Sequence, residues 1–226
     1  MFFRKDYAAP GPGVNPDEPE KTGAARFAQI LSIECVTLVK LNLLFLVSCV
    51  PLATIPPAVF AMNRVVRMMV LDQPVTCFYH YRTAFKTYWK RGYAAFLLTI
   101  VPLVLSGCGM WFYLSRAMAN FLLFLPFMLC STVFLLTLLA STYFYGLLAT
   151  ERSFRECLRL ALLLGGARPV RAVLAALSVY GSLLAAVLYI PLSLIYLVLI
   201  GFSVPCLLGH FFIRTELKRL EERGEG

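Results

Sequence analysis

Long apolar stretches without charged side chains alternate with short basic segments along the whole chain. The uncharged stretches cover residues 41–63, 92–115, 117–150 and 172–213. A transmembrane helix needs about 20 consecutive apolar residues to cross the hydrocarbon core of a bilayer. The first two stretches are each about one such length, and the last two are longer. The pattern predicts an all-α, polytopic helical membrane protein.

The basic residues indicate how this protein is oriented. Lys and Arg concentrate in residues 1–30, 62–92 and 150–171 and in the segment after residue 213. Short segments rich in Lys and Arg remain on the cytoplasmic side of a membrane. We therefore expect a multi-pass protein with both termini in the cytoplasm.

Three prolines decide the expected number of membrane segments: Pro51, Pro56 and Pro57. Proline cannot continue a regular helix, because it lacks an amide proton and its ring clashes with the preceding turn. A break here lets a short second segment return to the cytoplasmic side, which gives about six membrane segments. In order, these are residues 26–50, 58–71, 93–114, 121–148, 169–189 and 191–212. Five spans, with the N-terminus outside, is the alternative.

The length of the chain allows one membrane domain with a short polar segment at each end. Residues 1–24 are polar and rich in Pro and Gly, which is typical of a disordered cytosolic tail and unlike a cleavable signal peptide. Residues 25–213 form the predicted helical membrane domain. Residues 214–226 are rich in charge and are expected to form a C-terminal tail.

One amphipathic helix is predicted at residues 75–91. Its aromatic residues recur at helical spacing on one face: Phe78, Tyr81, Phe85 and Trp89. Its basic residues, four positions apart, form a stripe: Arg82, Lys86 and Lys90. Such a helix suits the membrane interface, where the basic side chains meet anionic lipid headgroups.

A second amphipathic helix is predicted at residues 153–165. Ser153 and Glu156 fit a capping box, in which both side chains satisfy free amides of the first turn. Arg155 and Arg159 lie on its basic side. The helix is expected to end at the glycine pair 165–166, after which Pro169 suits the first turn of the next span.

The two amphipathic helices suggest an internal repeat. A shift of 77 positions aligns four pairs of identical residues: Arg82 with Arg159, Ala84 with Ala161, Arg91 with Arg168, and Ala95 with Ala172. These matches are few and the residue types are common, so a true repeat and a chance similarity both remain open.

Composition argues against several classes of function. Hydrophobic residues make up 60% of the chain and charged residues 15%, and the net charge of +9 comes from basic residues between the spans. That placement favours anionic lipid over nucleic acid as the partner. The seven cysteines are too far apart to form a metal site or a disulfide framework. Because the chain also lacks the common catalytic and nucleotide-binding motifs, we expect no enzyme activity, no metal and no cofactor.

Lys40 and Asn42 are the candidate polar residues within the membrane. Both lie inside the first predicted span, where an ionisable group is a functional candidate by default. Alternatively, Lys40 snorkels or pairs with Glu34 or a helix carbonyl. A transporter would have a polar cavity at this depth, lined by groups such as Lys40, Asn42, Thr99, Tyr143 and Tyr180. An accessory protein would instead have a packed, mostly apolar interior.

Several short motifs resemble the YesL-like family of bacterial membrane proteins, also called domain of unknown function 624. Residues 41–46 read Leu-Asn-Leu-Leu-Phe-Leu, and residues 50–58 read Val-Pro-Leu-Ala-Thr-Ile-Pro-Pro-Ala. The family shows an Asn-Leu-Leu-aromatic run followed by a Pro-x-x-Thr-Ile-Gly-Pro-Ala turn, and here Pro56 replaces the glycine. Further similarity at residues 65–67, 78–90 and 158–161 extends the resemblance to about residues 25–215.

The resemblance implies a bacterial cytoplasmic membrane protein of uncharacterised function. Members of the family tend to accompany carbohydrate ABC importers and polysaccharide utilisation systems. We therefore expect an accessory component that works with the permease subunits of such an importer. The alternative is an autonomous small-solute transporter or a substrate-binding membrane subunit.

Overall fold

The computed structural model describes residues 23–117, 121–150, 152–190 and 193–222, and every regular element within them is helical. The expected tail at residues 1–24 lies almost wholly outside the described residues. The helices are α1 (Gly23–Cys49), η1 (Leu52–Thr54), α2 (Ile55–Val70), α3 (Cys77–Thr87), α4 (Trp89–Ala117), η2 (Phe121–Leu123), α5 (Phe124–Leu148), α6 (Phe154–Ala167), α7 (Pro169–Ala176), the π-helix η3 (Leu177–Gly181), α8 (Ser182–Leu188), α9 (Leu194–Leu199) and α10 (Ser203–Glu222).

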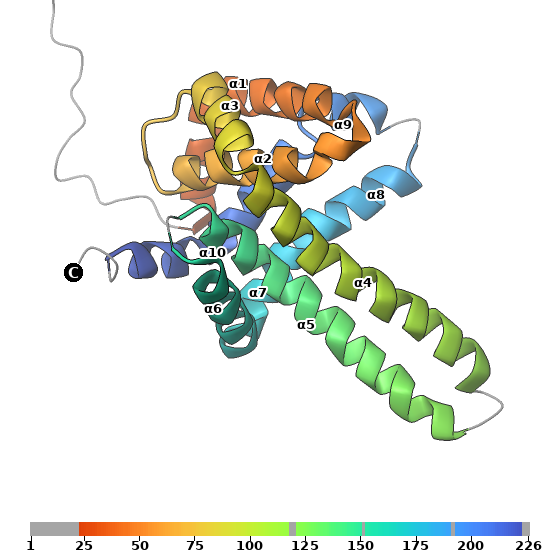
Figure 1. The fold of residues 1–226 in the computed structure, drawn as a ribbon. Helices are drawn as coiled ribbons and strands as arrows, with labels where there is room; N and C mark the ends of the chain where they lie inside the picture. Colours follow the sequence, from red (N-terminus) through yellow and green to blue (C-terminus); the bar gives the residue numbers. More distant parts are fainter. Residues whose placement is uncertain (1–22, 118–120, 151, 191–192, 223–226) are drawn as a thin grey trace, which may run out of the picture.

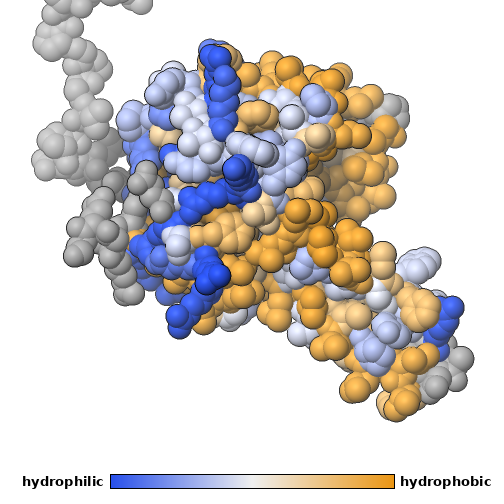
Figure 2. Space-filling view, in the orientation of Figure 1, coloured by the Kyte–Doolittle hydropathy of each residue, from blue (hydrophilic) through white to orange (hydrophobic). Residues whose placement is uncertain are grey.

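Four stretches of helix in the described part of the chain are long and apolar enough to cross a membrane. They are Gly23–Cys49, Trp89–Arg116, Phe121–Leu148 and Pro169–Leu188. Much of their apolar surface is exposed, which suits contact with lipid rather than water. Figure 2 shows this hydrophobic surface over the α4–α5 hairpin and the adjoining side of the body, with the hydrophilic surface gathered at the opposite end. The predicted class, an all-helical protein with membrane-length helices, is confirmed.

Helices α1, α2 and α10 form the centre of the body. Helix α1 is antiparallel to α10, because Phe27 packs against Phe211 near one end, with ring centroids 5.4 Å apart, and Phe45 packs against Phe202 near the other, at 5.1 Å. Helix α2 is buried along most of its length. Arg67 on α2 is only 6% exposed, so it does not reach outward as an interfacial arginine would. The short second segment is therefore an interior helix.

The expected proline break lies at the end of α1. Helix α1 ends at Cys49, and α2 begins with Pro56 and Pro57 in its first turn, where a missing amide proton leaves no hydrogen bond unmade. The chain then reverses, and Asp72 after α2 meets Arg26 near the start of α1. The break therefore brings the end of α2 back to the level at which α1 begins.

Helices α4 and α5 form a long antiparallel hairpin that extends away from the body (Figure 1). The two helices approach closely at Gly109, where an added Cβ would lie 2.7 Å from Cys130 Sγ. At the base of the hairpin, Arg91 donates to the backbone carbonyls of Thr150 and Arg152. These bonds fix the start of α4 beside the end of α5.

The first amphipathic helix differs in detail from its prediction. It ends at Thr87, and Trp89 already belongs to α4. Tyr81 and Ala84 are its buried residues, whereas Phe78 is 60% and Trp89 is 49% exposed. The expected aromatic face therefore points only partly inward. The reason is that α3 packs along the groove between α1 and α2, where the narrow Ala84 permits close approach.

The second amphipathic helix begins as expected. Ser153 Oγ accepts a hydrogen bond from the amide of Glu156 at 3.3 Å, while the Glu156 carboxylate bonds to Arg152 instead of closing the capping box. The glycine pair does not end the helix, which continues to Ala167. Gly165 is buried where α6 packs against Ala140 of α5, and an added Cβ would make only an ordinary contact there, at 3.5 Å from Ala140 Cα.

The segment expected to form a charged C-terminal tail is largely helical. Helix α10 continues through it to Glu222, and Leu217 is buried in the core. The segment therefore belongs to the packed domain. Glu216 and Leu217 face inward, which the overall charge of the segment had concealed.

Candidate functional site

Asn42 joins α1 to the break between α9 and α10. Its side chain is fully buried, and its amide nitrogen donates to the carbonyls of Leu197 and Val198 at 2.9 and 2.7 Å. Its amide oxygen accepts from the amides of Phe202 and Ser203 at 3.0 and 3.2 Å. One side chain thus satisfies four backbone groups that the interrupted helix leaves unpaired. Asn42 has a structural role and no free hydrogen-bonding capacity.

Lys40 lies elsewhere. It is exposed on the surface of α1, near Cys77 at the start of α3. The structure therefore separates the two candidate intramembrane residues, with one in the core and one on the surface.

A cavity of about 300 Å³, partly open to the outside of the protein, lies between α2, α4, α5, η3 and α10. This volume is at the lower end of the range for small-molecule sites. Most of its wall is aliphatic or aromatic. Its polar lining residues are Asn63, Thr99, Ser141, Thr142, Tyr145, Tyr180, Cys206 and His210. Of the five groups expected to line a transporter cavity, Thr99 and Tyr180 do so, and Lys40, Asn42 and Tyr143 do not.

Two pairs of hydroxyl groups join the helices around the cavity. Thr99 on α4 and Tyr145 on α5 are hydrogen-bonded through their oxygens at 3.0 Å. Ser141 on α5 and Tyr180 on η3 are bonded in the same way at 2.7 Å. Each pair therefore connects α5 to a different neighbour through an apolar interior.

Tyr180 lies within the π-helical turn of the fifth apolar stretch. A π-helix interrupts the regular bonding of an α-helix and occurs frequently at functional sites. Here it spans Leu177–Gly181, and three residues of this region line the cavity: Val179, Tyr180 and Leu183. No local signal in the sequence pointed to this π-turn.

A third polar group lies where α2 meets α10. Asn63 donates to Val59 O at 2.7 Å and accepts from Cys206 Sγ at 3.4 Å. His210 Nδ1 lies 3.0 Å from the carbonyl oxygen of Cys206, while Nε2 is buried without a partner in the described residues. His210 therefore carries spare hydrogen-bonding capacity at the cavity wall.

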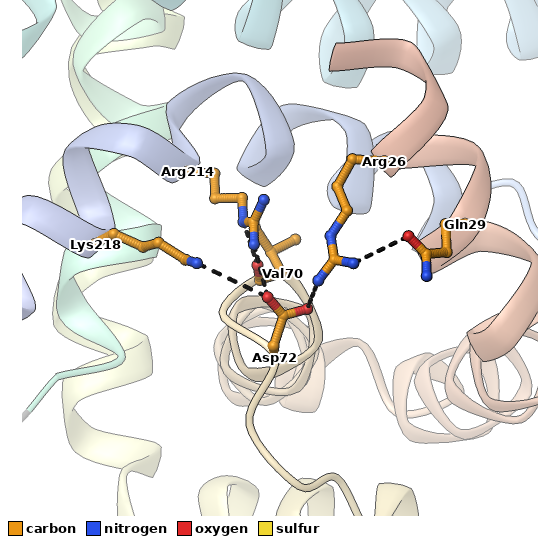
Figure 3. Close-up of polar contacts among 6 residues, drawn as sticks. All are labelled: Arg26, Gln29, Val70, Asp72, Arg214 and Lys218. Atoms are coloured by element: carbon orange, nitrogen blue, oxygen red, sulfur yellow. Dashed lines mark hydrogen bonds and ion pairs between the residues drawn. The ribbon is translucent and has the colours of Figure 1, made fainter. Parts of the chain in front are cut away.

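A cluster of charged residues holds together the ends of α1, α2 and α10. Figure 3 shows Asp72 between three basic side chains. Its carboxylate lies 2.7 Å from Arg26, 2.6 Å from Arg214 and 3.9 Å from Lys218. Arg214 also donates to Val70 O at 2.8 Å, which satisfies a carbonyl at the end of α2. Asp72 has a φ of 60°, a conformation that Asp and Asn tolerate better than other side chains.

A second ionic cluster holds α10 against α7. Glu216 is 3% exposed and lies 2.9 Å from Arg168 and 2.6 Å from Arg171. Nearby, Arg152 donates to Leu220 O at 2.8 Å. These contacts explain why the end of α10 packs as part of the domain.

The predicted interfacial basic residues are all exposed. They are Arg82 and Lys86 on α3, Lys90 in the first turn of α4, and Arg155 and Arg159 on α6. The opposite side of α6 is buried against α5 through Cys157, Ala161 and Gly165, and burial raises the pKa of the Cys157 thiol. Within the described ranges, no three His, Cys, Asp or Glu side chains gather where they could hold a metal ion.

Comparison with known proteins finds similarity to one family model over part of the chain. No curated protein and no solved structure matches the chain. The family model described as "Protein of unknown function, DUF624" matches residues 38–108, from the middle of α1 to the middle of α4. Asn42, Asn63 and Thr99 lie within that match, whereas the tyrosines of the cavity and His210 lie outside it. The resemblance to DUF624 read from the sequence is thereby confirmed over residues 38–108.

Proposed function

We propose that the protein is an integral membrane protein that binds a small molecule in this cavity, as a substrate-binding membrane subunit or a small-solute transporter. The observation that carries this proposal is the convergence of Asn63, Thr99, Ser141, Tyr145, Tyr180 and His210 on one cavity of about 300 Å³. A few placed polar groups in a mostly apolar wall are typical of small-molecule sites. No enzymatic role is proposed.

The proposed topology has six membrane segments with both termini in the cytoplasm of a bacterial cell. The six segments are the four stretches of membrane length together with two return segments, α2, which is buried along most of its length, and α9–α10. Arg26, Arg214 and Lys218 all meet Asp72, which supports placing the beginning of α1 and the end of α10 on the same side. Reporter fusions at each terminus test this arrangement. An extracellular N-terminus would favour five spans.

The binding proposal can be tested by filling the cavity. Leu103 lines it from α4, and Leu103→Trp would occupy part of its volume. The full-length wild type and the variant are each purified from native membranes. The small molecules that co-purify with each protein are extracted and compared by mass spectrometry. We expect a compound that is enriched with the wild type and lost from Leu103→Trp. Leu105→Trp, at an exposed position on the same helix, is the matched control. Equal extracts from all three proteins would contradict the proposal.

A second candidate function is supported by the basic surface of α3 and α6. Exposed Arg82, Lys86 and Lys90 can bind anionic headgroups, each contributing about 1 kcal/mol near a charged surface. The same surface can contact the permease subunits of a carbohydrate ABC importer, a partner suggested by the family resemblance alone. In this role the protein is an accessory component of that importer.

Two measurements separate the candidates. A pull-down from native membranes tests for a permease, and uptake by the purified protein in liposomes tests for autonomous transport. Single cysteines at Phe85 and Lys86, in a cysteine-free background, test the orientation of α3. We expect aqueous reagents to label position 86 more readily than position 85. Equal labelling would argue against an interfacial helix.

A further inference from the structure

The polar groups around the cavity are unequal in what they can still bind. Each side-chain hydroxyl has one proton to donate and two lone pairs to accept with. The hydrogen bonds at the cavity wall show which hydroxyl protons are already donated within the protein. The donors and acceptors that remain unused define the ligand that would complement them.

Tyr180 is left with acceptor capacity only. The hydroxyl of Ser141 donates to Leu138 O at 2.7 Å, so its one proton is already used by the carbonyl of its own helix. The 2.7 Å bond between Ser141 and Tyr180 must then be donated by the tyrosine. The Tyr180 oxygen has no proton left for a ligand, but it can still accept one.

Tyr145 is in the same state for the same reason. The hydroxyl of Thr99 lies 2.9 Å from Ala95 O and 3.0 Å from Phe96 O, and its proton is used there. Tyr145 therefore donates across the 3.0 Å bond to Thr99. Two tyrosine oxygens on the cavity wall are thus acceptors.

His210 adds a third acceptor. Its Nδ1 lies 3.0 Å from the Cys206 carbonyl oxygen, which can only accept, so Nδ1 carries the proton of the neutral ring. Nε2 then has a lone pair and no partner in the described part of the chain. The cavity wall also has one spare donor on Asn63. One proton of its side-chain amide is donated to Val59 O, and the second remains free.

The charge of the lining restricts the ligand further. No Lys, Arg, Asp or Glu is among the described residues that line the cavity, so a charged ligand would lose its hydration without a counterion at the cavity wall. Aliphatic and aromatic groups form most of the wall. A free sugar, which needs several donors and acceptors at once, is poorly matched by this lining.

We infer that the cavity binds a neutral, mainly apolar molecule through hydrogen bonds that the ligand donates, such as an alcohol or a phenol. This inference rests on the proposed binding function and specifies its ligand class. It requires the site to discriminate between a hydroxyl group and the corresponding methyl ether, because the ether cannot donate. The ether oxygen would face the acceptors of the cavity wall with no proton to form a hydrogen bond, and burying unpaired polar atoms is disfavoured.

The test uses two probes with the same ring system, 2-naphthol and 2-methoxynaphthalene, in which a methyl group of the ether replaces the proton that the alcohol can donate. Binding to full-length protein in lipid nanodiscs is measured by equilibrium dialysis, with empty nanodiscs subtracted to correct for partition into lipid. We expect the wild type to bind the alcohol about tenfold more tightly than the ether, which is the worth of about one buried hydrogen bond. Leu103→Trp should weaken both probes.

Two substitutions at one hydroxyl pair test the proton assignment. Tyr180→Phe removes an acceptor and should weaken the alcohol about threefold to tenfold, with little effect on the ether. Ser141→Ala instead frees the Tyr180 proton, so the ether should bind better and the discrimination should shrink. Thr132→Val, which removes an exposed hydroxyl from the same helix, should change neither.

The outcomes separate the ligand class from the existence of the site. Equal affinity for both probes, with Leu103→Trp weakening both, would overturn the inference and leave the cavity as a binding site. Binding of neither probe, or binding that Leu103→Trp does not alter, would contradict the inference, and the extraction experiment then decides the binding proposal separately. A Ser141→Ala protein that still rejects the ether would also overturn the assignment.

Discussion

Helix α10 connects two regions that differ in how their polar side chains are paired within an apolar domain. At its charged end, Arg214, Glu216 and Lys218 are all in ion pairs with neighbouring helices. Cys206 and His210 precede this charged end in the same helix. They line a cavity in which none of the described lining residues is formally charged. The charged end uses its interactions to join helices. The cavity keeps several acceptors unused.

This difference indicates how stability and binding are divided within the molecule. Buried charges without partners are disfavoured, so pairing the charges at the ionic end stabilises the fold. Neutral hydroxyl groups are less costly to leave partly unpaired, and unused acceptors are what a ligand needs. We therefore expect substitutions at the paired groups to lower stability and substitutions at the cavity to alter binding.

The largest loss of stability is expected at Asn42. Asn42→Leu removes four hydrogen bonds and leaves backbone groups of the α9–α10 break unpaired within the protein, which should lower the free energy of unfolding by about 3 kcal/mol. Lys40→Leu, at an exposed position of the same helix, should change it by less than about 0.5 kcal/mol. Thermal unfolding in detergent compares the two. Similar values for both would show that Asn42 does not hold the break.

A smaller loss is expected at Glu216. Glu216→Gln leaves Arg168 and Arg171 side by side without a counterion, but both arginines are about 40% exposed and water screens them. We therefore expect a loss of about 2 kcal/mol, less than for a fully buried pair. Arg159→Gln, which removes an exposed charge, is the control for a general effect of charge. If Glu216→Gln and Arg159→Gln had the same unfolding midpoint, the Glu216 ion pairs would not contribute to the stability of the domain.

Asp72 should matter less, because its side chain is 38% exposed. Asp72→Asn keeps a residue that tolerates a φ of 60° while removing the charge that pairs with Arg26 and Arg214. The expected loss is about 1 kcal/mol, and it should shrink as salt is added. Unfolding midpoints measured at low and high ionic strength test both parts. A loss independent of salt would point to the backbone rather than to the ion pairs.

The smallest effect on stability is expected at the cavity. Thr99→Val and Ser141→Ala each remove one interhelical hydrogen bond, and such bonds in membrane proteins contribute about 0.6 kcal/mol on average. The same two variants should change probe binding severalfold. The contrast with Glu216→Gln is the direct test of the comparison between the two regions. Unfolding losses as large as those of the ionic end would make the hydroxyl pairs structural.

Local signals predicted the elements whose cause is local. Pro51, Pro56 and Pro57 predicted the break after α1, because proline restricts the backbone of its neighbours. Ser153 predicted the start of α6, because capping depends on nearby residues. The basic stripe of α3 was predicted by spacing alone, and its side chains are exposed. The inward face of the same helix was predicted less well, because Tyr81 and Ala84 were selected by the shapes of α1 and α2.

The candidate site depended on contacts that no local pattern contains. Lys40 and Asn42 are two positions apart in sequence, so they point to different sides of α1. Asn63, Tyr145 and His210 come from three separate helices, and the sequence singled out none of them as cavity residues. Thr99 and Tyr180 were expected there, although their partners were not.

The sequence by itself determined that the chain forms helices of membrane length, where the chain breaks between the first two of them, and which residues form exposed basic stripes. These properties follow from hydrophobicity, proline geometry and periodicity, each of which acts within a few turns of helix. Only the tertiary structure decided that α2 is interior, that residues 214–222 belong to the domain, and that two tyrosines and a histidine become unused acceptors at one cavity. Those outcomes depend on which helices meet and on which proton each hydroxyl has already donated, and both are set by packing between residues far apart in the chain.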